Sequence, residues 1–206
     1  MEHTQLATRR PVATPTKFDR QGVLDVAADL ADEHGLANLT LAMLASEVGM
    51  RSQSLYAHVD GIEGLRDGLA LRGQAMLADR LRDAVMAKTG PDALRSVVRA
   101  LADFAGTHPG LYEASLRSPH DSPELREANE RTVAPLTAVL ESFGLDGDDL
   151  THHYRVIWSS VHGFVTLRHA GLLSWEASPD ESFELLVEMF VGEMQRYADA
   201  APGEPT

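Results

Sequence analysis

The segment Leu41–Val59, LAMLASEVGMRSQSLYAHV, has the most specific structural pattern in this chain. Apolar residues recur through its first half at three- and four-residue steps, the spacing that places side chains on one face of a helix. Thr40, just before it, is a residue type that favours the N-cap position. Gly49 follows, and glycine tolerates the positive φ at which a helix often ends. The stretch therefore predicts two short helices joined by a tight turn.

The second of these helices has one packing face and one free face. At about 100° of rotation per residue, Leu55 and Val59 face the protein together. Gln53 then points almost directly away, with Ser54 and Tyr56 on the flanks. This arrangement is typical of a helix-turn-helix whose second helix reads the major groove of DNA. The spacing alone is equally compatible with an ordinary pair of core helices.

A further helix is predicted upstream, from Phe18 to Gly35. Val23, Ala27 and Leu30 lie on one face of it, and a glycine ends it. This helix and the two short helices make a minimal three-helix bundle. We expect Ser52 to cap the second short helix.

Residues 18–65 resemble the DNA-binding region of the TetR family of bacterial transcriptional regulators. The resemblance is carried by Ala27, Ala28, Gly35, Leu44, Ala45, Val48, Gly49, Leu55, Tyr56, His58 and Leu65. Members of the family usually have a lysine that faces a phosphate at the start of the fourth helix, and this chain has Ile62 there. The resemblance therefore implies a DNA-binding protein with one fewer backbone contact.

The predicted DNA-contacting residues lie in the turn, on the second helix and upstream. They are Lys17, Thr40, Arg51, Ser52, Gln53, Ser54, Tyr56 and His58. A glutamine amide can pair with both edges of adenine, so Gln53 is the candidate for reading a base, whereas Ser54 and Tyr56 are expected to contact phosphates. Arg9, Arg10, Lys17, Arg20 and Arg51 are the basic candidates for phosphate contact. Arg9 and Arg10 are equally compatible with a solvated tail.

Charge is distributed unevenly along the 206 residues. The net charge is −13, which disfavours nucleic acid, but the first 72 residues hold seven Lys or Arg against ten Asp or Glu, and the remainder holds eleven against twenty-one. A hydrophobic content of 44% suffices for a core. The chain has no cysteine, no signal-like apolar run at its start and no membrane-length apolar segment. We expect a cytoplasmic protein that does not bind membranes.

Metal binding and catalysis find no support in the sequence. Nine histidines are present, but no two have His-x-x-x-His spacing. His162 and His169 share a predicted helix face about 10 Å apart along its axis, too far to hold one ion unaided. Glycine-rich phosphate loops and Gly-x-Ser-x-Gly elbows are absent as well. We expect no metal, no cofactor and no enzymatic activity.

From Leu65 onward, proline and glycine separate six further predicted helices, so the fold is predicted to be all-α with about nine helices. Three of the expected ranges are 61–88, 122–143 and 147–169. The predicted organisation is a flexible arm over 1–16, a helix-turn-helix DNA-binding domain over 17–64, an effector-binding and dimerisation domain over 65–200 and a disordered tail over 201–206. The segment from Trp158 to Gly163 resembles a signature of one subset of TetR-like C-terminal regions.

The resemblance implies a small-molecule pocket and a dimer formed by the last two long helices. The effector candidates combine apolar area with polar tips, and they are Phe104, His108, Tyr112, His120, Tyr154, Trp158 and His162. Each is also compatible with ordinary packing, and a satisfied histidine in a core or dimer interface is the simpler reading of His162. The dimer-interface candidates are Val165, Phe183, Val187 and Phe190.

The sequence thus predicts a ligand-responsive transcriptional regulator, a repressor that binds a palindromic operator in double-stranded DNA as a homodimer. Its effector is an unidentified small molecule. The alternative is a protein with the same helical scaffold that binds a small molecule or a protein partner without reading DNA. Ile62 and the net acidity favour this alternative.

Overall fold

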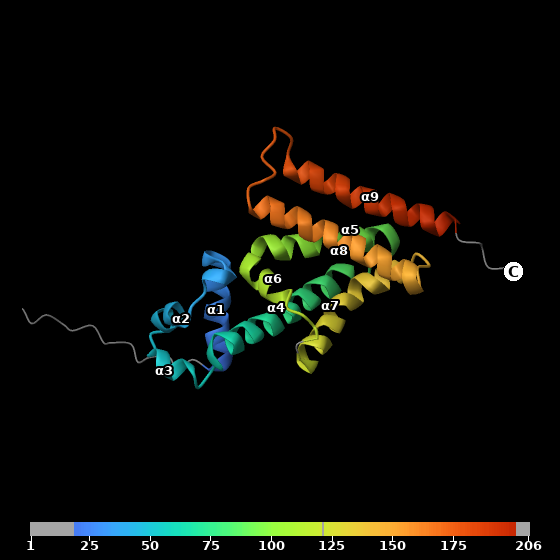
Figure 1. The fold of residues 1–206 in the computed structure, drawn as a ribbon. Helices are drawn as coiled ribbons and strands as arrows, with labels where there is room; N and C mark the ends of the chain where they lie inside the picture. Colours follow the sequence, from blue (N-terminus) through green and yellow to red (C-terminus); the bar gives the residue numbers. More distant parts are fainter. Residues whose placement is uncertain (1–18, 121, 201–206) are drawn as a thin grey trace, which may run out of the picture.

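The computed structural model describes residues 19–120 and 122–200, which fold into helices joined by short connections (Figure 1). The elements are α1 (Arg20–His34), the 3-10 turn η1 (Leu36–Asn38), α2 (Leu41–Glu47), α3 (Ser52–Leu55), α4 (Gly61–Val85), α5 (Gly90–Thr107), α6 (Pro109–Ser115), α7 (Pro123–Glu141), α8 (Gly147–His169) and α9 (Pro179–Ala200). The all-α prediction is confirmed for the described part of the chain. None of these helices is long and apolar enough to cross a bilayer.

Three of the predicted phosphate contacts, Arg9, Arg10 and Lys17, lie outside the described residues, as does the predicted tail over 201–206.

Helices α1, α2 and α3 form a small bundle at one end of the molecule (Figure 1). Val23 of α1, Leu44 of α2 and Leu55 of α3 are fully buried. Asp19 caps α1, because its carboxylate accepts the backbone N–H of Gly22 at 2.8 Å. The apolar faces predicted from the three- and four-residue steps are therefore the faces that pack.

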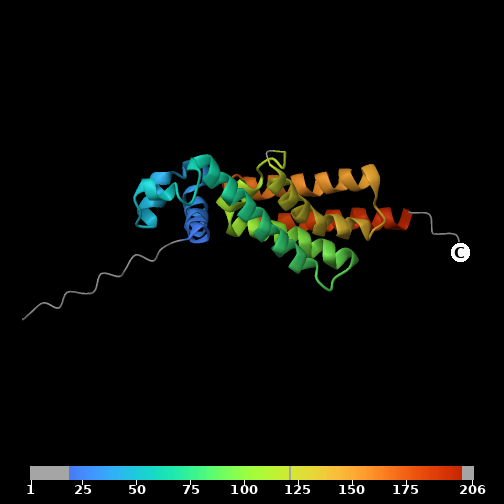
Figure 2. The same ribbon diagram turned by 90° about the horizontal axis from the view of Figure 1, so that it is seen from below.

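Helix α4 is the centre of the larger part. Helices α5, α6 and α7 pack on it, and α8 and α9 pack on α5. Seen from below, the bundle of α1 to α3 occupies one end, and α8 and α9 run along the other half (Figure 2). The predicted domain boundary after residue 64 falls inside α4, so one continuous helix joins the two parts.

The helix ends follow the sequence signals closely. Helix α8 has the bounds that the sequence predicts, and Ser122 caps α7 by accepting the N–H of Leu125 at 3.1 Å. Helix α4 ends at Val85, short of the predicted Lys88, because Met86 has an extended ψ of 128° and Ala87 a left-handed φ of 57°.

Helix α6 rests directly on the backbone of α1. A Cβ atom at Gly110 would lie 2.1 Å from the carbonyl oxygen of Ala31, far inside van der Waals contact. Only glycine permits this approach, so the residue at position 110 sets how closely the two helices meet.

Gly110→Ala is expected to lower the free energy of unfolding by about 1–3 kcal/mol, because the methyl group must push α6 away from a backbone that cannot yield. Urea denaturation followed by circular dichroism measures this loss. Gly106→Ala is the matched control, since its Cβ would point into open space and alanine favours a helix by about 1 kcal/mol over glycine. Similar destabilisation by both variants would contradict the steric explanation.

Candidate nucleic-acid interface and effector region

The turn between α2 and α3 has the predicted geometry. Thr40 caps α2 by accepting the N–H of Met43 at 3.2 Å. Gly49 has a φ of 66°, the left-handed conformation that ends the helix and turns the chain. The N–H of Met50 then bonds to the carbonyl of Ala45 at 2.9 Å, which satisfies an acceptor at the end of α2.

Helix α3 presents a polar face to solvent. Arg51, Ser52, Gln53 and Ser54 are all exposed, and Tyr56 has 60% of its surface exposed. Leu55, between them, is fully buried and fixes the helix to the bundle. Of the other predicted contacts, Thr40 is exposed and His58 is half-buried. The structure therefore brings the predicted turn and helix residues to one accessible surface.

The start and length of α3 differ from the prediction. Ser52 does not cap the helix: Arg51 occupies the N-cap position, and no side chain bonds to the first turn. The regular helix stops at Leu55 instead of reaching Val59. The N–H groups of Ala57 and His58 bond to carbonyls three residues back instead of four, as in the bond from His58 to Leu55 at 2.8 Å. Val59 is nonetheless buried as predicted.

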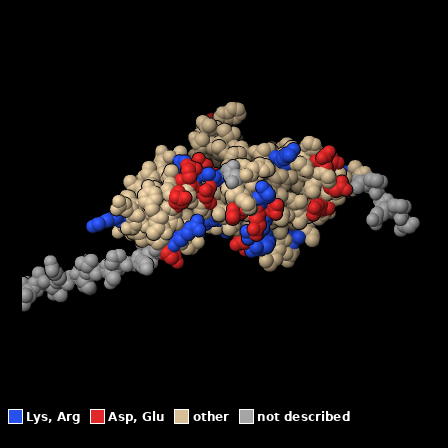
Figure 3. Space-filling model, turned by 60° about the horizontal axis from the view of Figure 1, so that its bottom comes forward, with Lys and Arg blue, Asp and Glu red and all other residues tan. Residues whose placement is uncertain are grey.

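Two arginines of this bundle remain available for phosphate. Arg20 and Arg51 are the only Lys or Arg residues within 19–64, and neither forms an ion pair with any residue that the structure describes. By contrast, Arg72 pairs with Asp25 at 2.5 Å. In the view of Figure 3, charged side chains gather along the middle and the far end of the molecule and are sparse over the bundle.

Ile62 is partly buried and packs against the hydrophobic core. The family resemblance implies a charged lysine at this position, at the start of α4. In this chain an apolar contact is found there instead.

A carboxylate joins the bundle to the larger part. Asp32 of α1 accepts the N–H of Leu111 at 2.9 Å and lies 2.9 Å from Nδ1 of His108. Helix α6 has no side-chain cap from its own N-cap residue, so Asp32 supplies the missing acceptor from a distant helix. This contact was not predictable from sequence, because Asp32 and His108 are far apart along the chain and each is an ordinary helix-end residue.

The effector candidates form two groups, and one residue lies apart from both. Tyr112, Tyr154, Trp158 and His162 cluster between α6 and α8: the Tyr112 hydroxyl lies 3.2 Å from His162 Nδ1, and the rings of Tyr154 and Trp158 stack at 5.7 Å. Burial raises the pKa of Tyr112 to about 12 and also raises the pKa of Tyr154.

The other three candidates lie elsewhere. Phe104 and His108 are in ring contact, with centroids 5.3 Å apart, and both line a cavity of about 380 Å³ between α4 and α5. His120 is exposed in the connection before α7 and lies in neither group.

A larger groove of about 750 Å³ lies among α4, α5, α8 and α9, and none of the effector candidates lines it. Its wall includes Phe164 and Phe183, with ring centroids 5.2 Å apart. Two ion pairs border it, Arg99 with Glu184 and Arg168 with Asp180, and the Arg99 guanidinium lowers the pKa of the Glu184 carboxyl. The residues come from four helices, so no local sequence signal indicates this groove.

Most of the predicted dimer-interface residues lie inside the chain's own core. Phe183, Val187 and Phe190 are buried in the subunit's own core, and Val165 is half-buried and lines the groove. The apolar stripe of α9 therefore packs against other helices of the same chain. The large apolar side chains that remain exposed on these two helices are Val156, Leu167, Leu185 and Met189.

Family models match both parts of the chain. Residues 23–68 match the model described as bacterial regulatory proteins of the tetR family, and residues 94–190 match a tetracyclin repressor-like C-terminal domain. The uncharacterized HTH-type transcriptional regulator Rv0681 of Mycobacterium tuberculosis is 33% identical over 91% of this chain and 86% of its own length. The HTH-type regulator YobS of Bacillus subtilis is 32% identical over 82% of this chain and 88% of its own length.

Solved structures share the fold. A protein of unknown function from Rhodococcus sp. RHA1 has a TM-score of 0.73 and 22% identity, with 87% of this chain and 97% of the other covered. A TetR variant of Acinetobacter baumannii AYE in complex with minocycline has a TM-score of 0.67 and 20% identity, with 88% and 99% covered.

Asp32→Ala is expected to lower the free energy of unfolding by about 1–3 kcal/mol, because it leaves the Leu111 N–H without its acceptor in a partly buried site. Urea denaturation measures the change. Asp29→Ala, on the exposed face of the same helix, should change stability by less than about 0.5 kcal/mol. An equal effect of the two variants would show that the Asp32 contact does not stabilise the junction.

Proposed function

Because this chain belongs to the TetR family of bacterial transcriptional regulators, we propose that it is a ligand-responsive repressor that binds a palindromic operator as a homodimer. The observation that carries the proposal is the exposed polar face of α3, held in place by the fully buried Leu55. Helix-turn-helix dimers insert one such helix from each subunit into successive major grooves, about 34–36 Å apart or a multiple of that distance.

The proposed roles on this face follow from side-chain chemistry. Gln53 reads a base, because its amide both donates and accepts. Tyr56, Ser54, Ser52 and Arg51 hold phosphates, which fixes the position of the helix on the duplex. Thr40 and His58 are secondary contacts, since the Thr40 hydroxyl already caps α2 and His58 is half-buried.

The proposed dimer uses the outer faces of α8 and α9. Val156 and Leu167 are exposed on α8, and Leu185 and Met189, one helical turn apart, are exposed on α9. Exposed apolar patches on a helix pair mark protein–protein contact surfaces, and in a two-fold dimer the same patch serves both subunits. We therefore place the proposed dimer surface on these exposed residues, because Phe183, Val187 and Phe190 are buried within the chain.

The proposed effector is a small molecule bound in the larger part. The solved TetR complex with minocycline supports this class of ligand. The Asp32 contact and the close approach of α6 to α1 offer a route by which a change in the larger part moves the bundle. A ligand that prefers one spacing of the two α3 helices over another would change operator affinity, typically by a coupling of about 1–3 kcal/mol.

Selection of bound duplexes from a random pool tests the proposed function. A palindrome with half-sites about one helical turn apart is expected, because a two-fold dimer presents two identical helices. The logarithm of affinity should also fall steeply with the logarithm of salt concentration, since several phosphates are contacted. Absence of duplex binding at low salt would instead support the alternative of a scaffold that does not read DNA.

Gln53→Ala is expected to weaken binding to the selected palindrome by about 1–3 kcal/mol per site and to relax the base preference at one position of each half-site. Tyr56→Phe should weaken binding to selected and scrambled duplexes alike, because a lost phosphate contact carries no sequence information. Fluorescence anisotropy with both duplexes measures the two effects. Identical losses for the two variants on every duplex would contradict this division of roles.

A further inference from the structure

The connection between α8 and α9, residues 170–178, carries two unusually exposed apolar side chains. Trp175 has 91% of its surface exposed and Leu172 has 65%. The other tryptophan of the chain, Trp158, is half-buried and stacks on Tyr154. Tryptophan buries a large apolar area when it finds a partner, so an indole held in water indicates a surface that something else covers.

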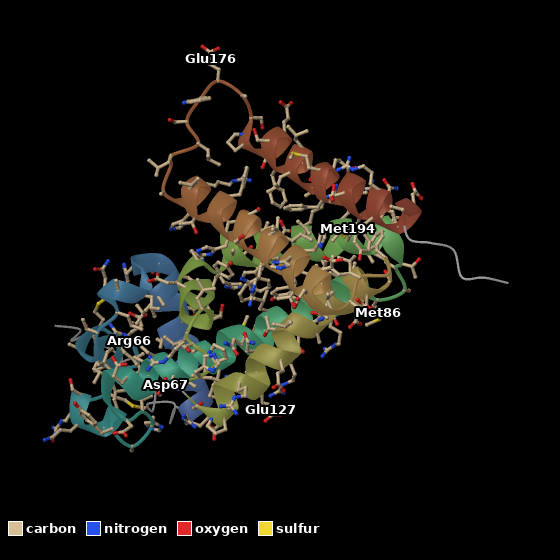
Figure 4. All side chains as sticks on the ribbon, turned by 45° about the vertical axis from the view of Figure 1, so that its right-hand side comes forward. Arg66, Asp67, Met86, Glu127, Glu176 and Met194 are labelled. Carbon is tan, nitrogen blue, oxygen red and sulfur yellow. The ribbon has the colours of Figure 1, made fainter. Side chains whose placement is uncertain are left out.

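The connection is fixed at its base and projects from the subunit. Arg168 at the end of α8 pairs with Asp180 at the start of α9 at 2.7 Å, and the N–H of Leu172 bonds to the carbonyl of Leu167 at 2.9 Å. Figure 4 shows the neighbouring Glu176 at the tip, pointing away from the rest of the molecule. Trp175, whose surface is 91% exposed, is therefore presented to solvent from an anchored segment.

The exposed apolar residues concentrate on this part of the molecule. Six of the nine large apolar side chains that are exposed in the described residues lie on α8, on α9 or on their connection. They are Val156, Leu167, Leu172, Trp175, Leu185 and Met189. The connection thus adds exposed apolar residues next to the two helices that carry the proposed dimer surface.

We propose that Leu172 and Trp175 form an arm that packs against the partner subunit, an inference that rests on the proposed homodimer. A two-fold dimer built on α8 and α9 places both arms at one interface, so each can reach the other subunit reciprocally. The charges around the arm disfavour phosphate-bearing surfaces: Glu176 and Glu181 are acidic, and Arg168 is already paired with Asp180. Trp is also among the residues that contribute most to binding at protein interfaces.

Tryptophan fluorescence tests the arm without DNA. In a Trp158→Phe background, Trp175 is the single tryptophan. Emission is measured over a range of protein concentrations, with sedimentation reporting the oligomeric state. As the concentration rises and the dimer forms, the emission of Trp175 should shift to shorter wavelength and acrylamide should quench it less. Trp175→Ala should raise the dissociation constant of the dimer by about 30-fold, the scale of an interface hot spot. If dilution does not reach the monomer, the rate of subunit exchange is measured instead, and it should be faster in Trp175→Ala than in the parent protein.

Met86→Ala is the matched control, because Met86 is 65% exposed but follows α4 and belongs to neither α8, α9 nor their connection. It should leave the dissociation constant unchanged. A dimer in which acrylamide quenches Trp175 as readily as free N-acetyltryptophanamide would overturn the arm and leave the homodimer standing. Protection of Trp175 in the monomer, or only after addition of DNA or anionic vesicles, would also overturn it. A chain that remains monomeric would overturn both proposals.

Discussion

The contact between α6 and the C-terminal end of α1 fixes how the small bundle sits on the larger part of the molecule. At Gly110 the two backbones meet with no side chain between them, and next to it the Asp32 carboxylate bonds to the start of α6. The close backbone contact prevents the two helices from moving closer together. The hydrogen bond to the Asp32 carboxylate resists their moving apart or sliding. The small bundle therefore cannot shift against the larger part without disturbing both, and the orientation of α3 follows from where α6 lies.

Local signals in the sequence were sufficient for most of the helix boundaries. Ser122 at the start of α7 and Gly144 after its end act through backbone groups within a few residues, so their effect does not depend on the rest of the fold. The same holds for Gly49, whose positive φ follows from the need to end α2. Ser52 was assigned wrongly as a cap because the start of α3 depends on where the turn places the chain, and Arg51 occupies that position.

The candidate sites show where sequence reasoning ends. A helical period identifies an apolar stripe on α9, but it cannot tell whether the stripe faces its own subunit or a partner, and Phe183, Val187 and Phe190 proved to face inward. His108 was assigned to an effector pocket from its chemistry alone. The structure gives it Asp32 as a neighbour, a pairing created by tertiary packing between residues that share no sequence pattern.

The length of α4 has a mechanical consequence. Its 25 residues make a rod of about 37 Å that starts beside the bundle and ends far inside the other part. A tilt of about 5° at one end of such a rod would displace the opposite end by about 3 Å, close to the rise of about 3.4 Å between stacked base pairs. A stiff helix of this length would therefore convert a small change of angle at one end into a displacement at the other end of about one base-pair step.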